Sequence, residues 1–368
     1  MKIVWFVHAI ASCWNNGNAH FLRGLGLALQ KLGHDVVFCE PRDSWSETNL
    51  LNDHGPEALD SFRVAFPTLR AEKYDPGHAD LEALTHRADL VIVHEWNEPA
   101  LVNAIGGLRK RGGRFTLLFQ DTHHRAATAP AEMRKFDLSG YDGVLAFGEV
   151  IAEIYRERGW SHRAWTLHEA ADASVFYPRQ AERECDLVWI GNWGDEERSS
   201  ELRECLIEPA QALDLRTQIY GVRYPAAVVQ ELAERGISYG GWLPNHAVPL
   251  AFAKSLLTVH VPRRPYAQAL PGIPTIRVFE ALACGIPLIC APWDDSEQLF
   301  PDGCYLTARD GNEMRQHMQS LLHDADLRQA LCSKALAAVA ARHTCDHRAH
   351  QLLGICAALN SAAAREAA

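Results

Sequence analysis

Thr275, Arg277 and Glu280 stand directly before an apolar run in the stretch PTIRVFEALACGIPLICAPWDD, which begins at Pro274. Thr275 can cap a helix that begins near Ile276, and the first backbone N–H groups of such a helix bind anions. Arg277 lies in the first turn, where its guanidinium can add charge-assisted hydrogen bonds to a phosphate. Glu280 follows one turn later on the same face, where its carboxylate can accept hydrogen bonds from two ribose hydroxyls. The spacing therefore indicates a site for a nucleoside diphosphate.

An ordinary amphipathic helix is the alternative interpretation of the same residues. Arg277 and Glu280 are three residues apart, so they can form an ion pair on the surface of a helix with no ligand involved. The elements along the rest of the chain favour the binding site over this alternative.

Short apolar runs alternate with helical patterns along the chain, and the alternation begins again near residue 185. This order is typical of parallel sheets covered by helices on both faces, so we expect two similar α/β halves. Two halves of this Rossmann-like kind bind ligands at the carboxyl ends of their strands, in the crevice between domains. The join is expected at residues 165–182, where periodicity is lost. The expected strands are 2–9, 34–40, 88–95, 114–121, 141–148, 185–192, 216–221, 238–243, 256–261 and 285–292.

The composition sets limits on the class of protein. A length of 368 residues predicts about two domains, and a net charge of −10 offers no general attraction for nucleic acid or an anionic bilayer. No apolar stretch approaches the ~18 residues that span a membrane. The ten cysteines form no C-x-x-C pair, which favours a reduced, cytoplasmic protein.

The stretch RVFEALACGIPLI, residues 277–289, resembles the signature helix of two-domain GT-B glycosyltransferases. It is most similar to the CgeB-like branch, related to spore maturation proteins, of the retaining group that includes glycogen and sucrose synthases. Residues 15–36, 168–178 and 186–204 resemble further motifs of that group in the same order. The resemblance implies a GT-B fold, with two Rossmann-like domains whose parallel sheets face an interdomain cleft.

The resemblance also implies the domain roles and the reaction. Residues 1–170 would form an acceptor-side domain, and residues 171–368 a nucleotide-sugar domain whose last helix, around 340–358, crosses back to the first. The implied reaction is transfer of a hexosyl group from a nucleotide diphosphate sugar, such as a UDP-sugar, to an unidentified acceptor. Retention of configuration, no metal and no other cofactor are expected. No membrane span is expected, and the acidic net charge argues against a nucleic acid as the acceptor.

The donor-side residues follow from the same resemblance. Glu280 would bind the donor ribose, and Thr275 and the backbone of Ile276 would lie beside the diphosphate. Arg198, with Arg277, would neutralise the leaving diphosphate. The loop that carries Arg198 begins at Asn192, which we also expect to contact the donor.

Two first-domain residues complete the expected site. Gly17 would let the first loop approach the donor closely. His123 resembles a histidine found beside the donor sugar, with His124 as its neighbouring candidate, and His94 ends another strand of the same domain.

One departure from the family is clear. The group often has Glu-x7-Glu, but the position eight residues before Glu280 is Gly272. Backbone N–H groups of residues 270–274 would then contact the sugar. Gly272 keeps one alternative open, a non-catalytic GT-B module that binds a nucleotide sugar or a partner protein. A second alternative is a GT-B sugar-nucleotide epimerase or phosphorylase.

Other constellations support different chemistry less well. Asp324 and Asp326 form an Asp-x-Asp pair between two helical segments, typical of a turn and helix cap rather than of a metal site. The loop after the first strand lacks G-x-G-x-x-G, which argues against a dinucleotide. Zinc is conceivable at a C-terminal group whose spacing matches no standard site: His343, Cys345, His347 and His350.

Aromatic and basic loop residues leave two further roles open. Trp14, Trp45 and Trp96 can stack on an acceptor or simply pack. Arg263 and Arg264 can reach the crevice or lie in solvent.

Overall fold

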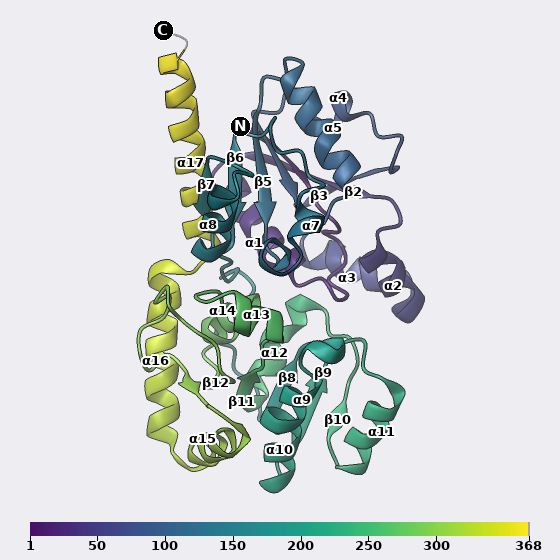
Figure 1. Ribbon diagram of the computed structural model, residues 1–368. Coiled ribbons are helices and arrows are strands. Elements are labelled where there is room, and N and C mark those ends of the chain that lie inside the picture. Colours follow the sequence, from purple (N-terminus) through teal and green to yellow (C-terminus); the bar gives the residue numbers. More distant parts are fainter. Residues whose placement is uncertain (367–368) are drawn as a thin grey trace. The chain divides into compact units, whose positions relative to one another are not determined.

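A computed structural model describes the backbone of residues 1–366 and the side chains of residues 1–361. The chain divides into two compact units (Figure 1). Unit 1 contains Met1–Glu169 and the segment that begins at Cys345, and unit 2 contains Ala170–Thr344.

Unit 1 is built on a parallel sheet of seven strands in the order β3-β2-β1-β4-β5-β6-β7. Its central strands are buried on both faces: Val4 of β1, which pairs with Val37 and Val91, and the next residue Trp5, whose side chain points to the opposite face, are both 0% exposed. The strands are β1 (Lys2–Phe6), β2 (Asp35–Pro41), β3 (Arg70–Tyr74), β4 (Leu90–His94), β5 (Thr116–Asp121), β6 (Gly143–Ala146) and β7 (Ala164–Thr166).

Helices cover this sheet, and the last of them comes from the far end of the chain. That helix, α17 (Cys345–Glu366), packs on α1 (Asn18–Lys31). The Arg348 guanidinium donates to the His168 carbonyl at 2.8 Å, and the Gln351 amide donates to the Thr166 carbonyl at 2.7 Å. The other helices are α2 (Trp45–His54), α3 (Glu57–Ala65), α4 (Leu81–Leu84), α5 (Pro99–Lys110), α6 (Arg125–Thr128), α7 (Pro130–Met133) and α8 (Glu149–Glu157).

Unit 2 contains a parallel sheet of six strands in the order β10-β9-β8-β11-β12-β13. The strands are β8 (Cys185–Ile190), β9 (Thr217–Tyr220), β10 (Ser238–Tyr239), β11 (Ser255–His260), β12 (Leu288–Cys290) and β13 (Leu306–Thr307). The helices are α9 (Ser199–Leu202), a π-helical stretch (Arg203–Ile207), α10 (Glu208–Ala212), α11 (Ala226–Glu234), α12 (Val248–Ala253), α13 (Arg264–Ala269), α14 (Ile276–Cys284), α15 (Gly311–His323) and α16 (Ala325–Arg342).

Two apolar cores lie on the two faces of the unit 2 sheet. Leu187 of β8 faces one core together with Leu206 and Met314, from the π-helical stretch and α15. Val188, the next residue of β8, faces the other core together with Phe252 of α12 and Phe279 of α14. Because both faces are filled, polar side chains that follow β8, β11 and β12 gather at the carboxyl edge of the sheet.

The expected α/β architecture with two parallel sheets is confirmed. The strand expected at 238–243 is shorter in the structure, because β10 ends at Tyr239 instead of continuing through the glycine pair at 240–241. The edge strand β3 has the polar sequence RAEKY and was not predicted, because its side chains are largely exposed.

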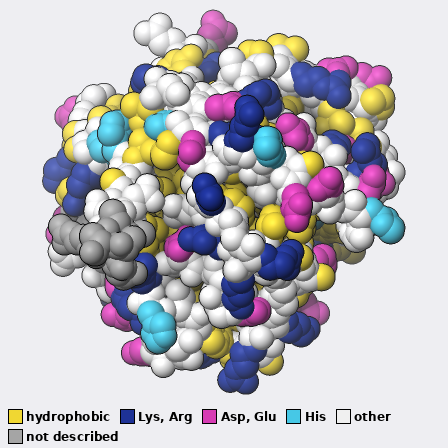
Figure 2. Space-filling view, turned by 90° about the horizontal axis from the view of Figure 1, so that it is seen from above, with side chains coloured by type: hydrophobic (Ala, Val, Ile, Leu, Met, Phe, Trp, Pro, Cys, Tyr) yellow, Lys and Arg dark blue, Asp and Glu magenta, His cyan; other side chains and the backbone are white. Residues whose placement is uncertain are grey.

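Acidic and basic side chains are interspersed on the face in Figure 2. Within the described part of the chain, no helix is both long and apolar enough to cross a membrane. All ten cysteines are free thiols.

Candidate functional site

Helix α14 begins at Ile276, directly after Thr275, as the sequence predicts. The predicted capping bond is wrong, however, because the Thr275 side chain accepts no hydrogen bond from the helix backbone. Its hydroxyl lies 3.0 Å from Nε2 of His260, the last residue of β11. Thr275 therefore joins the end of a central strand to the start of the helix.

Arg277 and Glu280 are paired inside the protein rather than on its surface. Nη1 of Arg277 donates to Oε2 of Glu280 at 2.5 Å, and the two side chains are 15% and 1% exposed. The other carboxylate oxygen accepts from the Asn245 amide at 2.9 Å. The predicted shared face is correct, and the ion pair of the alternative interpretation also forms, although it is buried.

Arg198 lies in the loop after β8, where its guanidinium is held by neutral groups. It donates to the carbonyls of Val261 and Asn192, at 3.0 and 2.6 Å, and to Oδ1 of Asn192. It also lies over the Trp189 ring, with 5.1 Å between Cζ and the ring centroid. Burial and the nearby charge of Arg263 lower the pKa of Arg198 to about 10. Among the residues whose side chains are described, no carboxylate accepts a hydrogen bond from this guanidinium.

Arg263 joins Arg198 at the same amide oxygen. Its Nη2 lies 3.3 Å from Oδ1 of Asn192, and its Nη1 lies 3.1 Å from a carboxylate oxygen of Glu197. The next residue, Arg264, is bound instead to both carboxylate oxygens of Glu201. Of the two basic residues, Arg263 belongs with Arg198.

His260 lies within electrostatic reach of two of these arginines. The side chain is 3% exposed. Burial, and then the charges of Arg198 and Arg277, lower the pKa of His260 to about 3, so the imidazole is neutral at physiological pH. His260 was not predicted as a site residue. Its signal is a polar side chain at the end of the largely apolar strand β11.

We name Arg198, Arg263, Arg277 and His260 the arginine cluster. Three of its N–H or ring-nitrogen atoms are buried without a hydrogen-bond partner among the described residues: Nε of Arg198, Nε of Arg277 and Nδ1 of His260. A buried polar group left unpaired costs about 1–3 kcal/mol. Such groups in one place indicate a ligand that pairs with them. The carboxylates of Glu197 and Glu280 pair with Arg263 and Arg277, and the charge of Arg198 is in excess of these two pairs, so an anion fits best.

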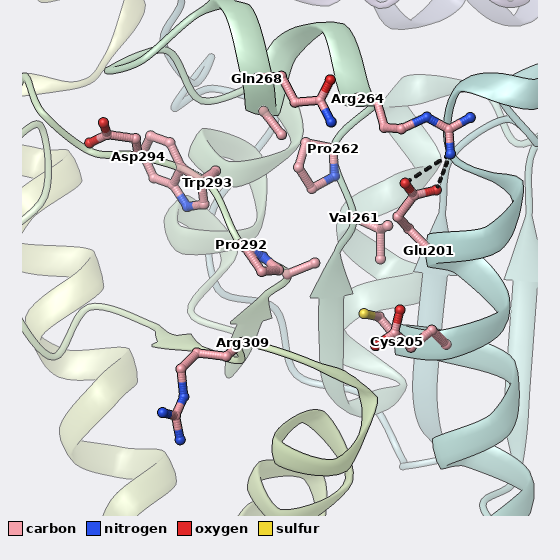
Figure 3. Close-up of a pocket in the computed structure, with 13 residues that line it drawn as sticks. Glu201, Cys205, Val261, Pro262, Arg264, Gln268, Pro292, Trp293, Asp294 and Arg309 are labelled. Carbon is pink, nitrogen blue, oxygen red and sulfur yellow. Dashed lines mark hydrogen bonds and ion pairs between the residues drawn. The ribbon is translucent and has the colours of Figure 1, made fainter.

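A cavity of about 430 Å³ adjoins the cluster (Figure 3). Val261 lines it and also accepts the hydrogen bond from Arg198. The Arg264–Glu201 pair lies at one side of the view, and Trp293 and Asp294 lie at the other. The lining residues are Glu201, Glu204, Cys205, Val261, Pro262, Arg264, Ala267, Gln268, Ala291, Pro292, Trp293, Asp294 and Arg309.

The predicted residues of the first domain lie in unit 1, apart in the chain from this cluster. Gly17 immediately precedes α1 with φ −64°, a conformation that any residue adopts, so the backbone does not require glycine there. His123 follows β5, and its ring packs edge-on against Trp96 at 4.8 Å between centroids. The His124 ring lies 4.0 Å from that of His123.

A buried polar network supports Trp96 and His123. Glu95 is fully buried and pairs with Arg125, whose guanidinium lies 4.6 Å from the Trp96 ring centroid. Burial raises the pKa of Glu95. Nε2 of His94 contacts the Thr122 hydroxyl at 3.0 Å, so His94 is a buried member of the network. Trp96 itself is 41% exposed, whereas Trp14 is buried and donates to Asp53.

The candidate metal residues have structural partners. Asp324 caps α16 by accepting from the Leu327 N–H, as its spacing predicts. His343 contacts the Leu299 carbonyl at 2.6 Å. Among the residues with described positions, no group of three or more His, Cys, Asp or Glu side chains could hold a metal ion.

Comparison with known proteins agrees with this architecture. Residues 198–354 match the model of a family described as glycosyl transferase-like. No curated protein matches the sequence significantly. A glycosyltransferase from Rickettsia africae superposes with a TM-score of 0.68 at 11% identity, over 97% of this chain and 98% of that chain. Sucrose-phosphate synthase from Thermosynechococcus elongatus gives 0.65 at 15% identity, over 98% and 100%.

A third similar structure contains a nucleotide. HepE from Anabaena, in complex with UDP, superposes with a TM-score of 0.66 at 14% identity, over 97% of this chain and 100% of that chain. Together these likenesses define the fold as that of GT-B glycosyltransferases. The sequence likeness to glycosyl transferase-like proteins covers most of unit 2 and the first part of α17.

Proposed function

We propose that this protein is a glycosyltransferase that binds a nucleotide diphosphate sugar in unit 2 and transfers the sugar to an acceptor. The observation that carries the proposal is the arginine cluster, with three buried nitrogens that lack partners at the carboxyl edge of a parallel sheet. A diphosphate has the acceptor oxygens and the negative charge that these groups need. The N-terminus of α14 adds a favourable dipole at the same edge.

The donor is proposed to be a UDP-sugar. HepE, which shares the fold, has been crystallised with UDP and with UDP-glucose. In this chain Glu280 would accept hydrogen bonds from the ribose hydroxyls. Its carboxylate is oriented by Arg277 and Asn245, and a carboxylate has about four lone-pair sites in all. The Thr275 and Ile276 backbone and Asn192 would lie beside the diphosphate.

Departure of the diphosphate is the step that these residues would assist. Negative charge builds on the leaving phosphate as the glycosidic bond breaks, and fixed cations stabilise that charge most where water is excluded. Arg198 and Arg277 would supply this positive charge without a metal ion. We further propose retention, in which the acceptor hydroxyl attacks from the side that the diphosphate leaves. A diphosphate oxygen would take the acceptor proton.

The acceptor is proposed to bind unit 1. Trp96 offers an exposed indole that is fixed from beneath by Arg125, and aromatic faces of this kind stack on sugars and other flat groups. His123 packs against the same indole and would contact the transferred sugar. We also assign the chain to the CgeB-like branch, from the sequence at 277–289, and place it in the cytoplasm, where ten free thiols stay reduced.

The direct test is binding of nucleoside diphosphates. Thermal unfolding is measured with UDP, GDP, dTDP and ADP, and a ligand at 100 times its Kd stabilises the fold by about 2.7 kcal/mol. A rise with UDP that is lost in Glu280→Ala supports the donor site. Release of UDP from a UDP-sugar then separates a transferase from a non-catalytic module. No rise with any nucleotide, in a folded sample, would contradict the proposal.

A further inference from the structure

Two loops that follow neighbouring strands meet at Gly272. The N–H of Gly272, in the loop after β11, donates to the carbonyl of Asp294, in the loop after β12, at 2.6 Å. Gly272 is buried and has φ +84°, a conformation that favours glycine. A Cβ placed there would lie 2.5 Å from Cγ and 2.9 Å from Oε1 of Glu297. The Glu297 side chain therefore fills the space that any side chain at position 272 would need.

The acidic residues of this second loop have separate surroundings. Asp295 holds the loop in shape, since it accepts from the N–H groups of Leu299 and Phe300. The Asp294 side chain lines the cavity of Figure 3. Glu297 is half-buried and differs from both, because its carboxylate lies over the Gly272 backbone.

Glu297 lies beside Gly272, and Gly272 is close along the chain to residues of the arginine cluster. Gly272 comes three residues before Thr275, and three residues span at most about 11 Å. Thr275 contacts His260, which is a member of the cluster. A diphosphate bound at the cluster carries its sugar directly on the outer phosphate. A half-buried carboxylate beside that phosphate can accept hydrogen bonds from sugar hydroxyls.

We propose that Glu297 binds hydroxyl groups of the donor's sugar and so contributes to the choice of sugar. The inference rests on the proposed function, because it requires a nucleotide sugar at the cluster. It also explains the glycine at position 272. Because Gly272 has no side chain, the Glu297 side chain from the other loop can occupy the space beside it. Glu297 acts here as a positioning and specificity residue, not as a group that forms a bond.

The test compares UDP with UDP-glucose, UDP-galactose and UDP-N-acetylglucosamine by titration calorimetry on the full chain. In Glu297→Gln we expect the affinity for UDP to stay within twofold of the original. We expect the affinity for the preferred UDP-sugar to fall about 10- to 100-fold, the usual value of a hydrogen bond to a charged group. The ratio between the affinity for the preferred UDP-sugar and the affinities for the other two should fall by a similar factor.

Gly272→Ala provides an independent route to the same result. Its methyl group should displace the Glu297 side chain and lower affinity for the UDP-sugar, and the double variant Gly272→Ala/Glu297→Gln should lose no more than either single variant. Asp302→Asn is the matched control, since it changes an exposed carboxylate of the same loop. It should bind UDP and the preferred UDP-sugar with the affinities of the unaltered protein.

The outcomes separate the two proposals. If the unaltered protein binds UDP and a UDP-sugar, but Glu297→Gln binds both as before or loses both equally, the role of Glu297 is wrong and the donor site stands. If the unaltered protein binds neither UDP nor any UDP-sugar, the proposed function is wrong and this inference is wrong with it.

Discussion

Nε2 of His260 lies 3.0 Å from the hydroxyl of Thr275, and this contact ties the end of β11 to the start of α14. The imidazole is buried beside the positive charges of Arg198 and Arg277, which oppose its protonation. His260 is therefore neutral where the surrounding charges would attract an anion. A neutral ring can keep its contact with Thr275 while the guanidiniums bind the ligand.

Acid should destabilise the fold partly through this histidine. The folded pKa of about 3 lies below the ordinary value of 6.5, so the unfolded chain binds a proton that the folded chain does not between those values. This histidine therefore does not lower the free energy of unfolding above about pH 6.5. As the pH falls below that value, it lowers the free energy of unfolding by up to about 1.4 kcal/mol per pH unit for one proton. Urea unfolding at pH 7 and pH 5 should show a smaller loss of stability in His260→Gln than in the unaltered protein. Equal losses would contradict the prediction.

Arg198→Ala should weaken binding of UDP about 10- to 100-fold, because a charged donor to the diphosphate is lost. Arg198→Lys should recover only part of this affinity, since an ammonium group lacks the planar fork of donors. Calorimetry on both variants provides the measurement. Arg216→Ala is a suitable control, as Arg216 pairs with Asp186 and its side chain is 63% exposed. Similar losses in the control and in Arg198→Ala would argue against a specific contact.

Arg277→Ala should lower the free energy of unfolding by about 3–5 kcal/mol, because the buried carboxylate of Glu280 is left without its cation. Glu280→Gln in the same chain should restore part of that loss by removing the unpaired charge. The four members of this cycle can be compared by urea unfolding at neutral pH. Additive losses from the two substitutions would show that the pair is not coupled.

Gly221→Ala should disturb the loop that carries Asn192 and Arg198. A Cβ at position 221 would lie 1.9 Å from the Gly191 carbonyl and 3.1 Å from the Asn192 nitrogen, so the loop must move. We expect lower UDP affinity together with lower stability. Gly236→Ala is the matched control: φ is +71° there, but nothing lies within 4 Å of the added carbon. It should cost about 1 kcal/mol of stability and leave UDP affinity unchanged. Unchanged affinity in Gly221→Ala would contradict the expectation.

The sequence predicted most of the elements that position the site. Strands β1, β8 and β11 are largely apolar, and the start of α14 at Ile276 follows from Thr275 and the spacing behind it. β13 was not predicted, because it has only two residues. Apolar periodicity identifies elements that pack on both sides and gives no signal for short or exposed edges.

The contacts inside the site were harder to predict from the sequence. The shared face of Arg277 and Glu280 is a local helical relationship, so spacing was sufficient to predict it. The Asn245 contact to Glu280 joins residues 35 positions apart, and neither has a pattern that points to the other. The same is true of Gly272 and Glu297, which meet only because the loops after β11 and β12 are neighbours at the sheet edge.

The place of α17 has a consequence for how the protein is made. Unit 1 needs its last helix from beyond Thr344, so the ribosome delivers the whole of unit 2 before unit 1 is complete. The surface of α1 that α17 covers stays open during this time. Domains generally fold as units while the chain is synthesised. Unit 2, which is continuous in sequence, can therefore finish folding first, although residue 1 emerges long before it.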